Sequence, residues 1–192
     1  LFMGQEFGQF IEWDEKKPLD WMLLSYDKHR QLQDYVKDLN HLYRDLPAFW
    51  QADYGWEGFQ WIVPDDNSQS VIVFRRMDLA GNEIIAACNF TPVTREDYQF
   101  GVPRPGAYKV LLSSDDESFG GSGVKLPAAR SRKKPMHGLD NSISVTLPAF
   151  SAVYFSVPAE KKAVKKAPAK KAGAKAAGRP AAKKTAKKTV DQ

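Results

Sequence analysis

The chain has 192 residues, and its 28 Lys and Arg against 23 Asp and Glu give a formal net charge of +5. This charge is unevenly distributed. Residues 160–192 hold 12 Lys and Arg against two acids, a net charge of +10, whereas residues 1–159 hold 16 against 21, a net charge of −5. An acidic body with a cationic tail excludes a protein that binds nucleic acid over its whole surface.

The single cysteine, Cys88, excludes an internal disulfide and a cysteine-based metal site. A lone cysteine in an apolar run is typical of a reducing compartment. No apolar run approaches the ~20 residues that a membrane-spanning helix needs. We therefore expect a cytoplasmic protein without membrane contact.

The chain opens with a short apolar run, Leu1 to Met3, that ends at Gly4. Continuous apolar runs are typical of parallel strands that are buried on both faces. Nothing precedes this run for it to pair with, so we expect it to be the last strand of a sheet. On this interpretation the chain is a C-terminal fragment of a longer protein.

A helix is predicted over residues 28–44. Asp27 is a candidate N-cap, Arg44 suits the helix C-terminus, and Pro47 prevents continuation. The apolar positions have helical spacing and are Leu32, Tyr35, Val36, Leu39, Leu42 and Tyr43. A strand, a loop and a helix in this order form one βα unit of the kind that builds a (β/α)₈ barrel.

From residue 56 the pattern changes to short β-branched and aromatic runs separated by turn residues, which predicts an antiparallel sandwich. The predicted strands are 58–63, 70–77, 83–90, 107–113, 142–147 and 150–157, with 98–102 as a short edge strand. A long loop follows residue 115. It carries a glycine-rich stretch at 120–123 and the basic cluster Arg130, Arg132, Lys133 and Lys134, and a loop of this length is either functional or mobile.

The last residues approximate a Lys-Lys-Ala repeat interrupted by Pro168 and Pro180. Alanine as almost the only apolar residue cannot bury enough surface to offset chain entropy, so we expect a disordered tail. The predicted organisation is the end of a barrel at 1–50, an all-β domain at 51–158 and the tail at 159–192.

Several motifs in this order carry a family resemblance. They are the segments 1–9, 12–13, 19–21, 40–45, 58–62, 89–93, 101–103 and 120–123. Over residues 1–157 the sequence resembles the C-terminal third of bacterial 1,4-α-glucan branching enzymes of the α-amylase superfamily. The resemblance implies the eighth strand and helix of a catalytic (β/α)₈ barrel, followed by the all-β C-terminal domain of that superfamily.

The resemblance also implies an activity and its partners. Branching enzymes transfer α-1,4-glucan segments to form α-1,6 branches in glycogen biosynthesis, without a metal or organic cofactor. Their three catalytic acids are borne on earlier barrel strands whose motifs have no match here, so no catalytic residue is assigned. The expected partners are an α-glucan and the missing N-terminal barrel portion, and the chain alone is predicted to be inactive.

Three residues near the start are candidates for substrate binding. Glu6 follows the expected barrel strand, where side chains face the active site, but it could equally be a buried structural carboxylate. Trp13 and Trp21 lie in the next loop, and an exposed indole suits the apolar face of a glucose ring. The alternative for both indoles is packing of the loop onto the barrel, which the apolar neighbours of Trp21 favour.

An aromatic cluster, Tyr54, Trp56, Phe59 and Trp61, could be a starch-binding surface. Phe59 and Trp61 share one strand face, however, which favours packing in the core or between domains. The three histidines, His29, His41 and His137, are scattered and predict no metal site.

Two other functions stay open. The first is another enzyme of the superfamily, either a hydrolase that trims malto-oligosaccharides or a trehalose-forming enzyme. The second is a polyanion-binding or nucleic-acid-binding module, because the lysine-rich tail can neutralise phosphates without reading sequence. A tail that merely solubilises the chain is the simpler alternative.

Overall fold

The computed structural model describes residues 2–160. By its internal contacts the chain divides into a compact unit over residues 1–160 and a second unit over 161–192. The prediction of a disordered tail therefore falls, from residue 161 on, outside the described residues. No helix within residues 2–160 has the length and apolar character needed to cross a membrane.

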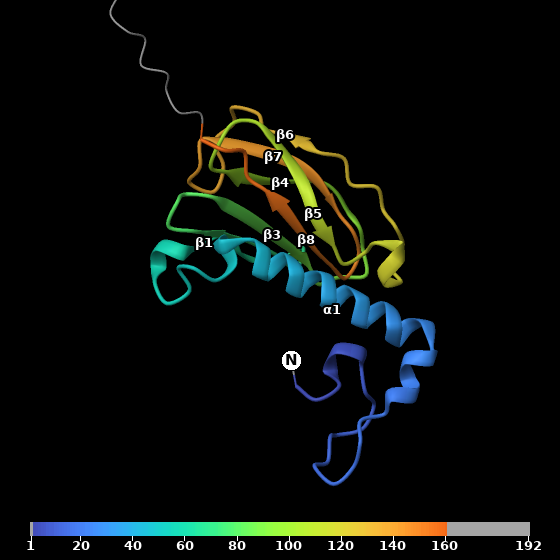
Figure 1. The fold of residues 1–192 in the computed structure, drawn as a ribbon. Helices are drawn as coiled ribbons and strands as arrows, with labels where there is room; N and C mark the ends of the chain where they lie inside the picture. The colour runs from blue at the N-terminus through green and yellow to red at the C-terminus, as the bar shows by residue number, and fades with distance from the viewer. Residues whose placement is uncertain (1, 161–192) are drawn as a thin grey trace, which may run out of the picture. The chain divides into compact units, whose positions relative to one another are not determined.

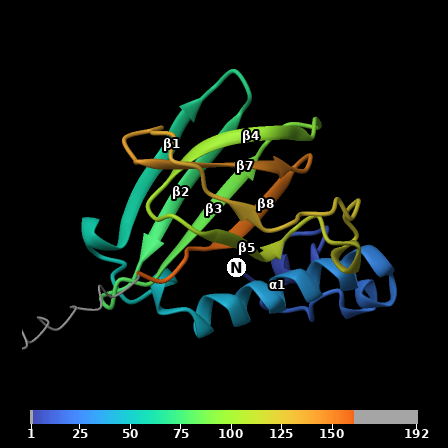
Figure 2. The same ribbon diagram turned by 90° about the horizontal axis from the view of Figure 1, so that it is seen from above.

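Two antiparallel sheets form a sandwich (Figures 1 and 2). The larger sheet has six strands in the order β1 (Phe59–Asp66), β2 (Val71–Met77), β3 (Glu83–Asn89), β8 (Ser151–Ser156), β5 (Ala107–Ser113) and β6 (Ala129–Arg130). The smaller sheet pairs β4 (Arg95–Val102) with β7 (Asn141–Leu147). The predicted antiparallel sandwich is confirmed.

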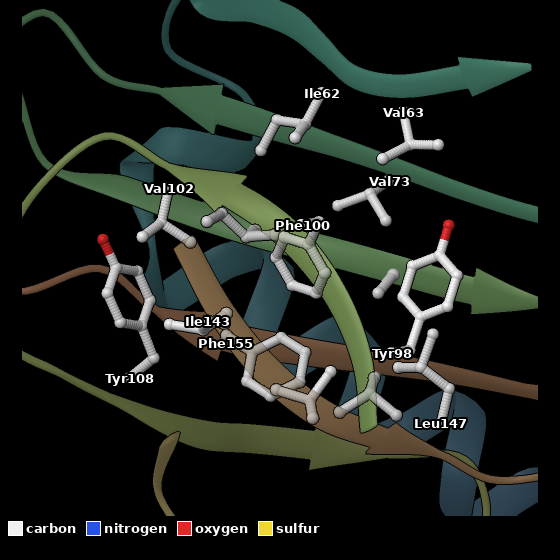
Figure 3. Close-up of a cluster of buried hydrophobic side chains, with 14 of the residues drawn as sticks. Ile62, Val63, Val73, Tyr98, Phe100, Val102, Tyr108, Ile143, Leu147 and Phe155 are labelled. Carbon is white, nitrogen blue, oxygen red and sulfur yellow. The ribbon is translucent and has the colours of Figure 1, made fainter. Parts of the chain in front are cut away.

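The core lies between the two sheets (Figure 3). Side chains alternate between the two faces of each strand, and those on the inner face form the core. Val71 and Val73 of β2 are buried between the sheets, while Ile72 and Phe74 lie on the opposite face. The fully buried side chains with the largest volumes are Tyr108, Phe100, Phe155, Ile85, Ile143 and Leu147, together with Phe7 outside the sandwich. Both sheets thus contribute apolar side chains to one continuous core.

All seven predicted strands are present, with differences at their ends. The expected edge strand at 98–102 begins earlier, at Arg95, and pairs with β7 along its length. The first predicted strand, 58–63, extends to Asp66 and includes Pro64, which β1 tolerates because it is an edge strand of its sheet. The two-residue strand β6 lies within the predicted long loop and was not predicted.

The predicted helix is confirmed as α1 (Asp27–Asp45), one residue longer at each end. The expected N-cap was wrong: Tyr26 occupies that position, and the Asp27 carboxylate instead pairs with Arg30. The helix lies against the outer face of the larger sheet (Figure 1). Tyr35 contacts Phe119 of the 115–124 loop at 5.4 Å between ring centroids.

The strand expected at residues 1–3 is not observed. Within the described residues Met3 and Gly4 form a turn, with φ of 36° and 90°, and the chain enters a short 3₁₀ helix, η1 (Gln5–Phe7). A parallel strand needs a hydrogen-bonded neighbour, and every strand among residues 2–160 belongs to the sandwich. The further 3₁₀ turns are η2 (Trp21–Ser25), η3 (Pro47–Phe49), η4 (Trp56–Gly58) and η5 (Glu117–Phe119).

Candidate functional site

Three aromatic rings form a platform on the outer face of β1 and β2. Trp61 lies directly opposite Phe74 across the two strands, with ring centroids 5.9 Å apart at 80°. Phe59 packs edge-on to Trp61 at 5.0 Å and stacks on Phe74 at 5.5 Å. We call Phe59, Trp61 and Phe74 the aromatic platform.

The platform is only partly covered: η3 and η4 contact β2, Phe59 and Phe74 are half-buried, and Trp61 is exposed. Over β3 the outward-facing side chains Ile84 and Ala86 are buried, since η3 packs against that strand. Over β1 the indole of Trp61 keeps 47% of its surface exposed. The outer face is therefore buried over β3, whereas Trp61 leaves aromatic surface accessible at the β1 edge.

A charged pair borders the platform. Arg76 is the partner of Phe59 across the strands, and its guanidinium donates to the Phe49 carbonyl at 2.8 Å and pairs with Asp53 at 2.5 Å. An aromatic face bordered by fixed hydrogen-bonding groups suits a sugar, whose ring has an apolar face and a rim of hydroxyls.

The expected cluster of four aromatic residues separates into two parts. Phe59 and Trp61 do share a strand face, as predicted, but it is the outer face, so they do not pack in the sandwich core. Packing between domains stays a prediction for them. The bulge in β1 after Trp61 brings Ile62 and Val63 inward as consecutive residues. Tyr54 and Trp56 are almost fully exposed on the segment before β1.

Phe74 was not among the residues predicted from the sequence. Its signal was available, because Ile72, Phe74 and Arg76 alternate with Val71 and Val73 along one strand. The pairing register that places Phe74 opposite Trp61 is a tertiary property, however, and the sequence of one strand does not determine it.

The three predicted binding residues lie in the N-terminal segment, on other elements than the platform. The Glu6 carboxylate accepts a hydrogen bond from the Gly4 amide at 3.1 Å and lines a hollow of about 590 Å³ beside α1. Trp13 is 38% exposed and packs edge-on against Phe2, which lines the same hollow, with ring centroids 5.2 Å apart. Their role in substrate binding stays a prediction.

Trp21 begins η2 and leaves 54% of its surface exposed. Its ring lies 5.3 Å from that of Phe7, which is fully buried beneath η1. The indole thus contacts a buried ring of the N-terminal segment, and much of its surface remains exposed. The structure is therefore compatible both with loop packing and with sugar binding by Trp21. Glu6 and the Phe2 partner of Trp13 line the same hollow, whereas Trp21 contacts Phe7 and does not line it.

Three carboxyl groups accept several hydrogen bonds from neighbouring loop residues. Burial raises the pKa of Asp66, Asp78 and Asp115, but hydrogen bonds outweigh it in each and lower the pKa below the usual range. A catalytic general acid needs a raised pKa. Residues 2–160 contain no group of three or more His, Cys, Asp or Glu side chains placed to hold a metal ion.

Comparison with known proteins adds a family. Residues 61–158, about half of the chain, match the family described as "Alpha amylase, C-terminal all-beta domain". The chain is 46% identical over 157 residues to the 1,4-alpha-glucan branching enzyme GlgB of Halothermothrix orenii and 47% identical over 156 residues to that of Aquifex aeolicus. These matches cover 81% and 80% of this chain.

The chain spans about a quarter of the length of these curated relatives, 25% in both cases. Among solved structures, a pullulanase of Group B Streptococcus is a looser match, with a TM-score of 0.48 and 15% identity over 81% of this chain and 25% of that chain. The family model matches the residues that form the two sheets of the sandwich. The chain therefore belongs to the family of α-amylase C-terminal all-beta domains.

Proposed function

We propose that this chain is the C-terminal part of a 1,4-α-glucan branching enzyme, which transfers α-1,4-glucan segments to form α-1,6 branches. The observation that carries the proposal is the identity of 46% over 157 residues to a protein of that name. The alignment is longer than the sandwich family match, which covers residues 61–158, so the likeness extends beyond the sandwich.

The N-terminal segment supports this assignment by its uncovered apolar surface. Phe2, Met3, Phe10, Ile11, Met22 and Tyr26 are all exposed, each with half or more of its surface accessible. Exposed large apolar side chains in this number are typical of a region that packs against a further protein element. We propose that residues 1–50 are the end of a catalytic (β/α)₈ barrel whose remaining elements cover this surface, and that residues 51–158 are the C-terminal domain.

The division of labour follows from the chemistry of retaining transfer. Two carboxyl groups about 5 to 5.5 Å apart must flank the scissile bond, one as nucleophile and one as acid and then base. On this proposal those groups belong to the remainder of the barrel. The described chain contributes binding surface: Glu6, Trp13 and Trp21 beside the barrel, and the aromatic platform on the sandwich for a more distant part of the glucan.

Stacking against the platform needs no cofactor, since the ring faces and the bordering Arg76–Asp53 pair supply both apolar contact and hydrogen bonds. Holding a long donor or acceptor chain at a second point raises its effective concentration at the reacting bond. A cytoplasmic glycogen-synthesising enzyme also fits the reducing compartment expected from the single cysteine.

Glucan binding by the platform is tested by electrophoresis of the 192-residue chain in gels with and without amylopectin. Trp61→Ala should reduce the retardation at least about tenfold in apparent affinity, equivalent to roughly 1.4 kcal/mol. Trp56→Ala is the matched control, because this indole is 87% exposed and has no described aromatic partner. Equal retardation of the two variants would remove the platform from the proposal.

Catalysis is tested separately with iodine-stained amylose. The 192-residue chain should leave the spectrum unchanged, because it lacks the acid and nucleophile. A longer protein that includes the complete barrel should shift the spectrum and create α-1,6 bonds. A shift caused by the chain alone and abolished by Glu6→Gln would overturn the assignment, and reducing sugar released without new branches would indicate a hydrolase of the same superfamily.

A further inference from the structure

Residues 2–160 include a strongly basic surface. Between Ser118 and Leu139 the sequence has five Lys or Arg and no acid, although residues 1–159 are acidic as a whole. Four of the five are exposed on β6 and the residues that follow it: Arg130, Arg132, Lys133 and Lys134, which we call the basic strip. The backbone of Arg132 is fixed to that of Ser142 of β7 by two hydrogen bonds of 2.8 and 3.0 Å.

The charges of the basic strip do not hold the fold together. Among residues 2–160 there are six ion pairs, and none involves the basic strip. By contrast Arg75 and Arg104 are largely buried and both pair with Glu83, at 2.9 and 2.7 Å. Lys134 donates to the Gln99 side chain at 3.0 Å, but the guanidinium groups of Arg130 and Arg132 have no hydrogen-bond partner within residues 2–160. Their donors are available to a ligand.

A hollow of about 390 Å³ lies between β6 and β7, and its lining matches an oxyanion better than a sugar. Arg130 and Arg132 line it together with three hydroxyl side chains, Ser131, Ser144 and Thr146. Guanidinium and hydroxyl donors are the groups that proteins use for phosphate oxygens. The one aromatic residue of the lining, Phe155, is buried in the core and offers no face for stacking.

One opposing charge is present. Asp97 lines the same hollow and accepts a hydrogen bond from the Ser144 hydroxyl at 3.3 Å. In the lining of the hollow, one carboxylate is present with two guanidinium groups, those of Arg130 and Arg132, so the formal charge of the lining is +1.

The remaining sequence indicates which anion the surface fits. Residues 161–192 add 12 Lys and Arg against one acid, with no aromatic residue. Two cationic segments on one chain suit a long polyanion that neither reads by sequence.

We propose that the basic strip binds the phosphate backbone of nucleic acid. This inference is independent of the proposed glucan transfer. Inorganic polyphosphate shares the phosphate chemistry, and an acidic protein shares the charge, so both enter the test as competitors. Since phosphate contacts carry no sequence information, binding should be indifferent to base sequence.

The test uses the full 192-residue chain and a fluorescent 20-bp DNA duplex, with anisotropy measured between 50 and 200 mM NaCl. The strip variant carries Arg130→Gln, Arg132→Gln, Lys133→Gln and Lys134→Gln. The control variant loses the same charge from the N-terminal part, through Lys16→Gln, Lys17→Gln, Arg30→Gln and Lys37→Gln. Unchanged thermal unfolding of both variants shows that the fold is intact.

Each lost phosphate contact should reduce the slope of log affinity against log salt by about 0.9. The strip variant should therefore lose about 2 to 4 in slope, and the control variant less than about 1. Deletion of residues 161–192 should weaken binding but leave a salt-dependent remainder that the strip substitutions remove.

Three results would overturn the proposal. The first is an equal effect of the strip and control variants, and the second is the absence of any binding after deletion of 161–192. The third is displacement of the DNA by polyglutamate at equal charge, or by polyphosphate at a tenfold lower phosphate concentration. Displacement by polyglutamate would assign the surface to an acidic protein, and displacement by polyphosphate would assign it to polyphosphate.

Discussion

The N-terminal segment 2–26 is richer in large aromatic and aliphatic residues than the sandwich, but the two regions place them differently. In the sandwich, alternation along paired strands turns one set of side chains into a shared core, so that Phe100 has no exposed surface. In the N-terminal segment the backbone follows turns and 3₁₀ helices, and Phe10 keeps 80% of its surface exposed.

The burial of apolar side chains in these two regions therefore follows from backbone pairing and not from composition. A strand that pairs on both sides has its side-chain directions fixed, and a second sheet can then cover one face completely. The N-terminal segment has local turns and contacts with α1 but no second layer. The sandwich should therefore be stable by itself, whereas the N-terminal segment should depend on what covers it.

The largest effect is expected for Phe100→Ala. This substitution removes a fully buried ring between the two sheets and should lower the free energy of unfolding by about 3–5 kcal/mol. Thermal and urea unfolding measure it. The control is Phe90→Ala, just beyond β3, where the ring is mostly exposed. Equal melting temperatures for the two variants would contradict the core described above.

A slightly smaller loss is expected for Asn89→Leu. The buried Asn89 amide donates to the Val93 and Pro148 carbonyls, both at 2.8 Å, and accepts from the Thr91 amide and hydroxyl. Leucine has a similar volume but leaves these groups without partners, so about 2–4 kcal/mol should be lost. Asn40→Leu on the exposed face of α1 should be nearly neutral. A loss below 1 kcal/mol in urea unfolding would mean that water replaces the amide.

A local, pH-dependent effect is expected in the loop that contacts α1. The Asp115 carboxylate accepts bonds from the Ser122 amide and hydroxyl and from the Val124 amide, at 2.7–3.0 Å. Burial raises its pKa, but these bonds outweigh burial and lower the pKa below the usual value of 3.8. The carboxylate therefore stabilises the loop above pH 3.8, and this contribution is lost as the pH falls through the lower, folded-state pKa.

Hydrogen exchange of the Ser122 and Val124 amides measures this contribution. Protection should fall on acidification with a midpoint below pH 3.8, and Asp115→Asn should remove the pH dependence. A midpoint above 3.8 would show that burial, and not hydrogen bonding, controls this group.

The smallest effect is expected for Phe10→Ala, which tests the other side of the comparison. Its ring contacts His29 edge-on at 5.0 Å but is otherwise exposed, so the free energy of unfolding should change by less than about 0.5 kcal/mol. Urea unfolding under the conditions used for Phe100→Ala gives the direct comparison. A loss above 2 kcal/mol would show that the N-terminal segment contributes to the cooperative core.

The sequence predicted the regular elements well because their signals are local. The spacing of Leu32, Tyr35 and Leu39 identifies α1, and alternation with turn residues identifies the strands. The failures depend on distant partners. The apolar run at the start was expected to be a strand, but a strand exists only where another pairs with it. The strand β6 has two residues and exists because Ala107 and Tyr108 of β5 pair with it.

The candidate site was less predictable than the fold. The pattern placed Phe59 and Trp61 on one face of a strand, which the structure confirms, but it could not decide which face the helical layer would cover. That outcome depends on where α1 and η3 pack, and no local signal in β1 encodes it. The basic strip was visible as a charge cluster, but its lack of ion pairs required side-chain positions.

The last strand in the sequence, β8, occupies an inner position of the larger sheet, between β3 and β5. During synthesis, β1 to β3 and β5 are therefore complete long before the strand that joins them has been made. One edge of β3 pairs with β2, but the other edge, Ile84 to Asn89, has its partners at 151–156, more than 60 residues later. Until then β3 and β5 present unpaired edges of the kind that recruit other chains. Because of this strand order, the larger sheet is completed late and in one step, when β8 is made. A chain interrupted before Ser151 would be left as two aggregation-prone half-sheets.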